Sequence, residues 1–106
     1  MSADGSEQFL EQLAESSPEV IEAVVGRHID NIKQSGLDPR THALVRIAAL
    51  VAVGAPSASF GWQVAMAREA GASDDEIAGV LIAVAPAVGL PRAVGAAPLL
   101  TKALQG

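Results

Sequence analysis

The chain has 106 residues, a net charge of −5 and no cysteine. Its length fits one domain. Half of the residues are apolar, and alanine dominates among them, with two Phe, one Trp and no Tyr. This composition favours closely packed helices over a sheet. The seven Lys and Arg residues are scattered, which excludes the basic footprint of a nucleic-acid-binding protein. The absence of cysteine excludes disulfides, thiolate metal sites and thiol redox cycles. Because an alanine-rich core buries little area, we also expect homo-oligomerisation.

The sequence predicts no membrane segment. The N-terminus is acidic and polar rather than that of a signal peptide. The apolar run over residues 47–61 is too short to span a bilayer and is interrupted by Gly54 and Pro56. We therefore expect a cytoplasmic protein that binds neither membrane nor nucleic acid and needs no cofactor and no metal.

Two helices are predicted at the start of the chain. The first is a short amphipathic helix over residues 6–17. The second has Ser17 as its cap and Pro18 at its first position, and Gly36 ends it.

The next two helices have clear ends. Asp38 and Pro39 repeat the cap-plus-proline signal and predict a helix that runs to Gly54. The following helix covers residues 57–70, and Gly71 stops it. The core positions predicted for these two helices are Leu44, Ile47, Ala48, Val51, Phe60, Val64 and Ala67.

Ser73 and Glu76 have the spacing of a capping box and predict the start of another helix. This helix is apolar nearly all round from Val80 to Leu90, so we expect it to be buried on most sides. Pro86 removes a backbone donor, which predicts a kink or a break.

A final helix is predicted over residues 91–105, with an interruption near Pro98. No segment alternates apolar and polar residues with a period of two. The predicted fold is therefore all-α.

Five short motifs follow one another from Leu37 onward. They read LDPRT (37–41), ALVRIAALVAVG (43–54), AMAREAGAS (65–73), DDEI (74–77) and GLP (89–91). Their order and spacing resemble the carboxymuconolactone decarboxylase / alkylhydroperoxidase D-like family. The resemblance implies a bundle of about six helices around a helical hairpin, assembled into homotrimers or hexamers with sites near subunit contacts. It also implies a single domain over residues 1–106, with an N-terminal helical pair (1–36) and a family core (37–106).

Redox members of this family carry C-x-x-C-x-x-x-H at the turn of the hairpin. Counting back from Gly71, the two cysteine positions fall on Pro56 and Ser59, and the histidine position falls on Gln63. The thiolate pair and its proton relay are thus replaced at every position.

The family glutamate is also missing, since its position falls on Ala43 or Leu44 and no carboxylate occurs between Asp38 and Glu69. Peroxidase or disulfide-reductase activity of the family type is therefore excluded. The decarboxylase branch of the family has a basic, histidine-containing segment at this turn. The uncharged turn of this chain disfavours decarboxylation of carboxymuconolactone.

Three polar or aromatic residues of the turn are candidate ligand contacts. Ser59 and Gln63 lie four residues apart and share a helix face, where they either line an inherited pocket or satisfy backbone groups. Without a neighbouring base, the Ser59 hydroxyl is a poor nucleophile. Trp62, the sole tryptophan, is a pocket wall, an interface anchor or a packing residue.

Two basic residues on the preceding helix complete the predicted pocket. His42 lies in the first helical turn, where the helix dipole disfavours its protonated form, so it is a general base or a cap-adjacent surface residue. Arg46 lies among apolar residues and is either an anion anchor or half of an ion pair with an early acidic residue or another subunit.

Three functions remain open for a pocket of this composition. They are a non-redox enzyme or accessory protein for a small organic acid or metabolite, a small-molecule binding or sensing module, and a purely structural oligomer.

Overall fold

A computed structural model describes Glu11 and residues 18–106 of the chain. The chain forms two compact units, residues 1–36 and residues 37–106. The described residues form five α-helices and no strand, which confirms the all-α prediction. The opening helix predicted over residues 6–17 lies outside the described residues except for Glu11, which is helical.

The first unit contains α2 (Pro18–Ser35). The helix begins at the predicted proline, carries Glu19 in its first turn and Lys33 in its last, and so complements the helix dipole at both ends. Gly36 follows it with a φ of 71°, as expected for a glycine that ends a helix.

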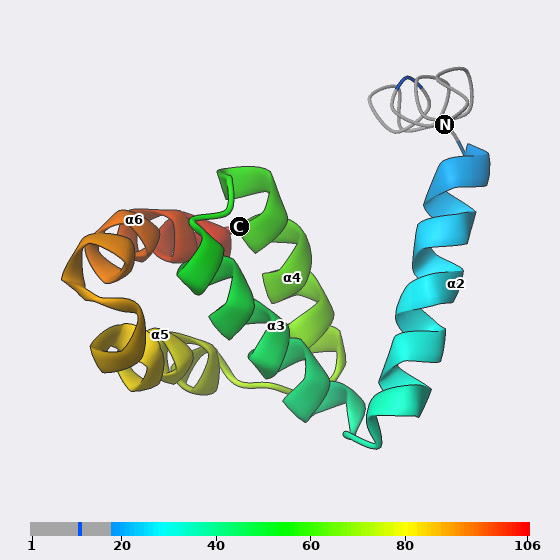
Figure 1. Ribbon diagram of the computed structural model, residues 1–106, viewed down its shortest axis with the longest axis horizontal. Helices are drawn as coiled ribbons and strands as arrows, with labels where there is room; N and C mark the ends of the chain where they lie inside the picture. Colours follow the sequence, from blue (N-terminus) through cyan, green and yellow to red (C-terminus); the bar gives the residue numbers. More distant parts are fainter. Residues whose placement is uncertain (1–10, 12–17) are drawn as a thin grey trace. The chain divides into compact units, whose positions relative to one another are not determined.

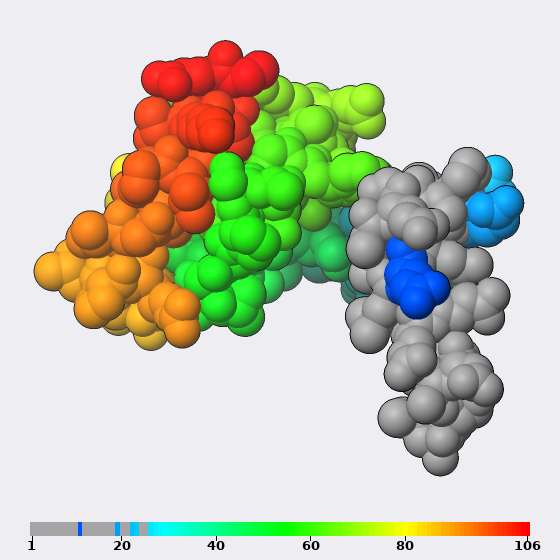
Figure 2. All heavy atoms as spheres, turned by 90° about the horizontal axis from the view of Figure 1, so that it is seen from above, coloured from blue at the N-terminus to red at the C-terminus, as the bar shows by residue number. Residues whose placement is uncertain are grey.

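The second unit is a bundle of four helices, α3 (Pro39–Val53), α4 (Ser57–Glu69), α5 (Asp74–Val88) and α6 (Leu90–Gln105). Each of the four contacts the other three. Figure 1 shows α3 and α4 side by side as a hairpin. In Figure 2 the orange-to-red side chains of α6 pack against the green ones of α3 and α4.

The turn between α3 and α4 depends on Gly54. Its backbone is left-handed (φ 67°, ψ 45°), which a side chain would strain. The Gly54 amide donates to the Val51 carbonyl at 3.2 Å, and the Ala55 amide donates to the Leu50 carbonyl at 3.0 Å. This pair of hydrogen bonds is a Schellman motif, which caps the end of α3 and turns the chain back along it.

The core of the second unit consists of small and medium side chains, and Phe60 is its only aromatic residue within the described part of the chain. Five of the predicted core positions, Ile47, Val51, Phe60, Val64 and Ala67, are buried, whereas Leu44 and Ala48 are half-buried. The remaining buried apolar positions are Ala43, Ala55, Ala72, Ile77, Ala93, Ala96 and Leu100. Because alanine is small, the helix backbones approach closely.

The expected burial of α5 on most sides is wrong for the chain by itself. Ile77 is the only residue of α5 that is fully buried, whereas Ile82 is 76% exposed and Leu90, just beyond the helix, is 73% exposed. A helix that is apolar all round shows only that apolar side chains are present, and not which neighbour covers them.

Neither helix breaks at its inner proline, because α5 runs on past Pro86 and α6 past Pro98. The interruption predicted near Pro98 is therefore wrong, and of the kink or break predicted at Pro86 the break does not occur. Both prolines are exposed. The carbonyls that lose a partner belong to the exposed residues Ile82 and Val94, where water can replace the missing donor.

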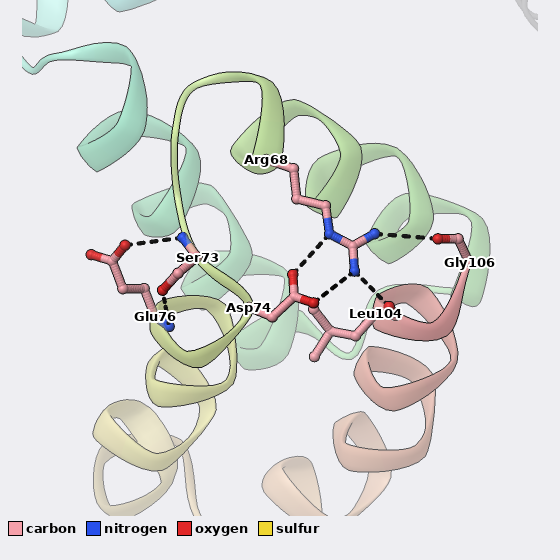
Figure 3. A network of polar contacts seen from close by, with 6 residues as sticks. All are labelled: Arg68, Ser73, Asp74, Glu76, Leu104 and Gly106. Carbon is pink, nitrogen blue, oxygen red and sulfur yellow. Dashed lines mark hydrogen bonds and ion pairs between the residues drawn. The ribbon is translucent and has the colours of Figure 1, made fainter.

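Arg68 connects three helices at one end of the bundle (Figure 3). Its Nε and Nη2 donate to the two carboxylate oxygens of Asp74 at 2.9 and 3.1 Å. Its Nη2 and Nη1 also donate to the backbone carbonyls of Leu104 and Gly106. The guanidinium holds the pKa of Asp74 below its ordinary value through these hydrogen bonds, so the pair is charged near neutral pH.

The capping box predicted at the start of α5 is confirmed. The Glu76 amide donates to Ser73 Oγ at 3.1 Å, and the Ser73 amide donates to Glu76 Oε1 at 3.0 Å. Glu76 also forms an ion pair with Arg40, which links the first turn of α5 to that of α3.

Two isoleucines of α5 test this packing. Ile77→Ala is expected to lower the free energy of unfolding by about 2–5 kcal/mol, because it leaves a cavity at a position with no exposure. Ile82→Ala is the matched control and is expected to change it by less than about 0.5 kcal/mol in dilute protein. Chemical denaturation measures both, and equal losses would contradict this assignment of the core.

Candidate functional site

The candidate site lies between the middle of α3 and the first half of α4. A cavity of about 340 Å³ opens there. Its lining residues come from both helices of the hairpin and are Arg46, Leu50, Ala58, Ser59, Trp62 and Gln63. The Gly54 turn folds α4 back against α3. Arg46 and Gln63, which are 17 residues apart in the sequence, therefore come into contact.

Gln63 is the buried polar residue of this cavity, with an exposed fraction of 4%. Its Oε1 accepts a hydrogen bond from Arg46 Nε at 3.3 Å. This contact fixes the orientation of the amide, since only the oxygen can accept from a guanidinium. The Gln63 Nε2 group has no hydrogen-bond partner within the described part of the chain. A buried donor left without an acceptor costs about 1–3 kcal/mol.

Arg46 supplies the positive charge. Arg46 is exposed, and neither of the two ion pairs among the described residues includes it. Its recorded hydrogen bond goes to the neutral amide of Gln63, so no carboxylate of residues 37–106 compensates its charge. A guanidinium with free donors beside a cavity binds anions well, because it presents several N–H groups in a fixed plane.

Ser59 and Trp62 form the remaining functional part of the wall. Ser59 is half-buried in the first turn of α4, where its amide donates to the Pro56 carbonyl at 3.1 Å. Trp62 is 54% exposed, and its Nε1 donates to Met66 Sδ at 2.9 Å. The tryptophan is therefore a wall of the cavity rather than a core residue.

Two of the sequence candidates do not line the cavity. His42 lies one helical turn before Arg46, but it packs inward and is only 4% exposed. Burial, and secondly the charge of Arg46, lowers its pKa below the ordinary value of 6.5. Pro56 caps the start of α4 and is exposed. The imidazole is thus neutral at physiological pH and lies behind the wall.

Sequence reasoning missed two apolar lining residues, Leu50 and Ala58. Both lie four residues from a predicted site residue on the same helix, Leu50 from Arg46 and Ala58 from Trp62. The i,i+4 neighbour rule would have found them.

Within the described residues, no three His, Asp or Glu side chains are grouped so that they could hold a metal ion. None of the described helices is long and apolar enough to cross a membrane.

Comparison with known protein families gives one result. The model of the carboxymuconolactone decarboxylase family matches residues 18–102. The chain belongs to this family. No curated protein and no solved structure matched the chain. The family match begins at the first residue of α2, so it is wider than the core from residue 37 onward on which the resemblance rests.

The sequence contains no cysteine, so the thiolate pair of the family's redox members is absent. The cavity instead combines a guanidinium, an amide donor and a hydroxyl with an indole wall. These groups can bind and orient a small molecule. The lining contains no acid or base that titrates near neutral pH.

His42 gives the protein a measurable pH dependence. Since its pKa is lowered in the folded state, the unfolded chain takes up a proton that the folded chain does not. The free energy of unfolding is therefore expected to fall as the pH drops below about 6.5, and His42→Gln is expected to remove this contribution. Chemical denaturation between pH 7 and pH 5 measures the slope.

Asp74, whose pKa is lowered from 3.8, affects stability only at more acidic pH and does not interfere. An unchanged slope in His42→Gln would contradict the buried, neutral state of this imidazole.

Proposed function

We propose that this chain is a member of the carboxymuconolactone decarboxylase family without thiol peroxidase activity that binds, or acts on, a small organic metabolite. The binding site is the cavity that Arg46 and Gln63 line together. The observation that carries the proposal is the Gln63 Nε2 donor, which is buried beside the cavity and has no acceptor in the described residues. A ligand with a carbonyl or carboxylate oxygen would supply the missing acceptor.

Binding fits the available chemistry better than covalent catalysis. Ser59 has no base beside it, since His42 packs behind the wall and the lining holds no carboxylate. The absence of cysteine leaves no thiolate to reduce a peroxide. Turnover of a bound metabolite would have to rely on positioning and on the charge of Arg46.

The variant Gln63→Leu tests whether Gln63 binds a ligand or only packs in the core. If Gln63 serves a ligand, the substitution removes an unsatisfied buried donor and is expected to leave the free energy of unfolding unchanged or raise it by up to about 1 kcal/mol. The same variant is expected to lose ligand retention. A large loss of stability would indicate that Gln63 is a packing residue.

Retention is measured by incubating the protein with a mixture of small organic acids and neutral metabolites, followed by gel filtration and mass spectrometry of the bound compounds. Gln105→Leu changes the same residue type at an exposed position of α6 and is expected to retain whatever the wild type retains. A compound recovered with unchanged mass indicates binding without turnover. If the wild type retains nothing, the cavity is not a ligand site.

The exposed apolar surface of the second unit supports a further part of the proposal, homo-oligomerisation. Ile82, Leu90 and Val94 are all more than half exposed in the single chain. Burying such side chains against a second copy would contribute to stability in proportion to the area removed from water.

Sedimentation velocity over a range of concentrations tests this assembly. We expect the wild type to sediment as a trimer or a hexamer, and Ile82→Glu to dissociate more readily because it places a charge on the apolar surface. Gln105→Glu is the control for added charge. A wild type that remains monomeric at the highest concentration would contradict the proposal.

A further inference from the structure

We propose that the cavity selects a small monocarboxylate with an apolar body, and that Gln63, oriented by Arg46, determines this selectivity. The inference rests on the proposed function, because it names the class of ligand that the same cavity takes.

The polar groups at the cavity include three kinds of hydrogen-bond donor. The Gln63 oxygen accepts from Arg46 Nε, so the donor left without an acceptor is the buried NH₂ group of the same amide. The terminal nitrogens of Arg46 have no recorded partner in the described residues. Ser59 adds a hydroxyl that rotates to donate. Of these groups only the Ser59 hydroxyl can also accept, so the lining favours a ligand rich in acceptor oxygens over an amine.

The charge of the lining sets the charge of the ligand. Arg46 carries the single positive charge, and no Asp or Glu lines the cavity. His42, the nearest other basic residue on α3, is neutral at physiological pH because its pKa is lowered by burial. One carboxylate is therefore balanced by one guanidinium, whereas a second carboxylate would find no cation in the lining.

The rest of the wall is apolar and the space is small. Trp62, Leu50 and Ala58 are the apolar residues of the lining. The volume of about 340 Å³ lies near the lower end of the range of small-molecule sites, about 300–1,000 Å³. A single ring stacked on the indole with its carboxylate toward Gln63 and Arg46 satisfies both halves of the cavity.

Isothermal titration calorimetry with four probes tests the charge selectivity. Benzoate is expected to bind at least about tenfold more tightly than benzamide, its neutral isostere. 4-Carbamoylbenzoate, a monoanion, is expected to bind at least about tenfold more tightly than terephthalate, a dianion of the same shape. Quenching of Trp62, the only tryptophan in the chain, shows whether each probe binds at this cavity.

Four variants assign the selectivity to residues. Arg46→Gln is expected to weaken benzoate binding by about tenfold or more and to abolish the preference over benzamide. Arg46→Lys keeps the charge but cannot make the planar contact to the amide, so it is expected to keep the preference at lower affinity. Gln63→Leu is expected to weaken benzoate binding by about tenfold, and Gln105→Leu to leave it unchanged.

The outcomes distinguish the two proposals. If benzamide binds the wild type as tightly as benzoate, or terephthalate as tightly as 4-carbamoylbenzoate, the cavity is a ligand site but the inference about its charge is wrong. If neither Arg46→Gln nor Gln63→Leu changes benzoate affinity, the assignment to these residues is wrong. If no probe and no compound of the metabolite mixture binds, the proposed function fails together with the inference.

Discussion

The close approach of α3 and α4 is the constraint on which the rest of the molecule depends. Gly54 permits the left-handed turn, and Ala43 and Ala67 are buried on the facing helices with little side-chain bulk between the backbones. This approach brings Arg46 within hydrogen-bonding distance of Gln63. At the opposite end of the hairpin from the Gly54 turn, Arg68 ties the last turn of α4 to α5 and α6. The cavity is thus held between rigid elements rather than by a loop.

The buried Gln63 amide is costly, because the only other buried polar side chain among the described residues is that of His42. A leucine at position 63 would fill similar space without leaving a buried donor unpaired. By the resemblance drawn from the sequence, Gln63 is expected at the position where redox members of the family carry their histidine. The buried, unpaired donor at this position is the reason for proposing a ligand site rather than a turn that has only been filled in.

Local signals in the sequence were sufficient for the helix ends, because each depends on a few neighbouring residues. The Ser73–Glu76 capping box and the glycine at position 54 are of this kind. The burial of α5 could not be predicted in the same way, since an apolar helix does not reveal what covers it. The contact between Arg46 and Gln63 depends on the angle and register at which two helices pack. The spacing of residues along one helix gives no information about either. The same limitation applies to His42, whose inward orientation follows from the packing of α3 against its neighbours.

The central claim is that the Gln63 amide donates to a ligand oxygen in the cavity, and nuclear magnetic resonance of its side-chain NH₂ group tests it most directly. The two proton signals can be assigned from their absence in Gln63→Leu. Addition of benzoate is expected to move both the nitrogen and the donated proton of this group to lower field and to slow its exchange with water, with smaller changes on addition of benzamide. Signals that stay in place while benzoate is added to saturation, or that already exchange slowly because a protein carbonyl accepts from Nε2, would contradict the account.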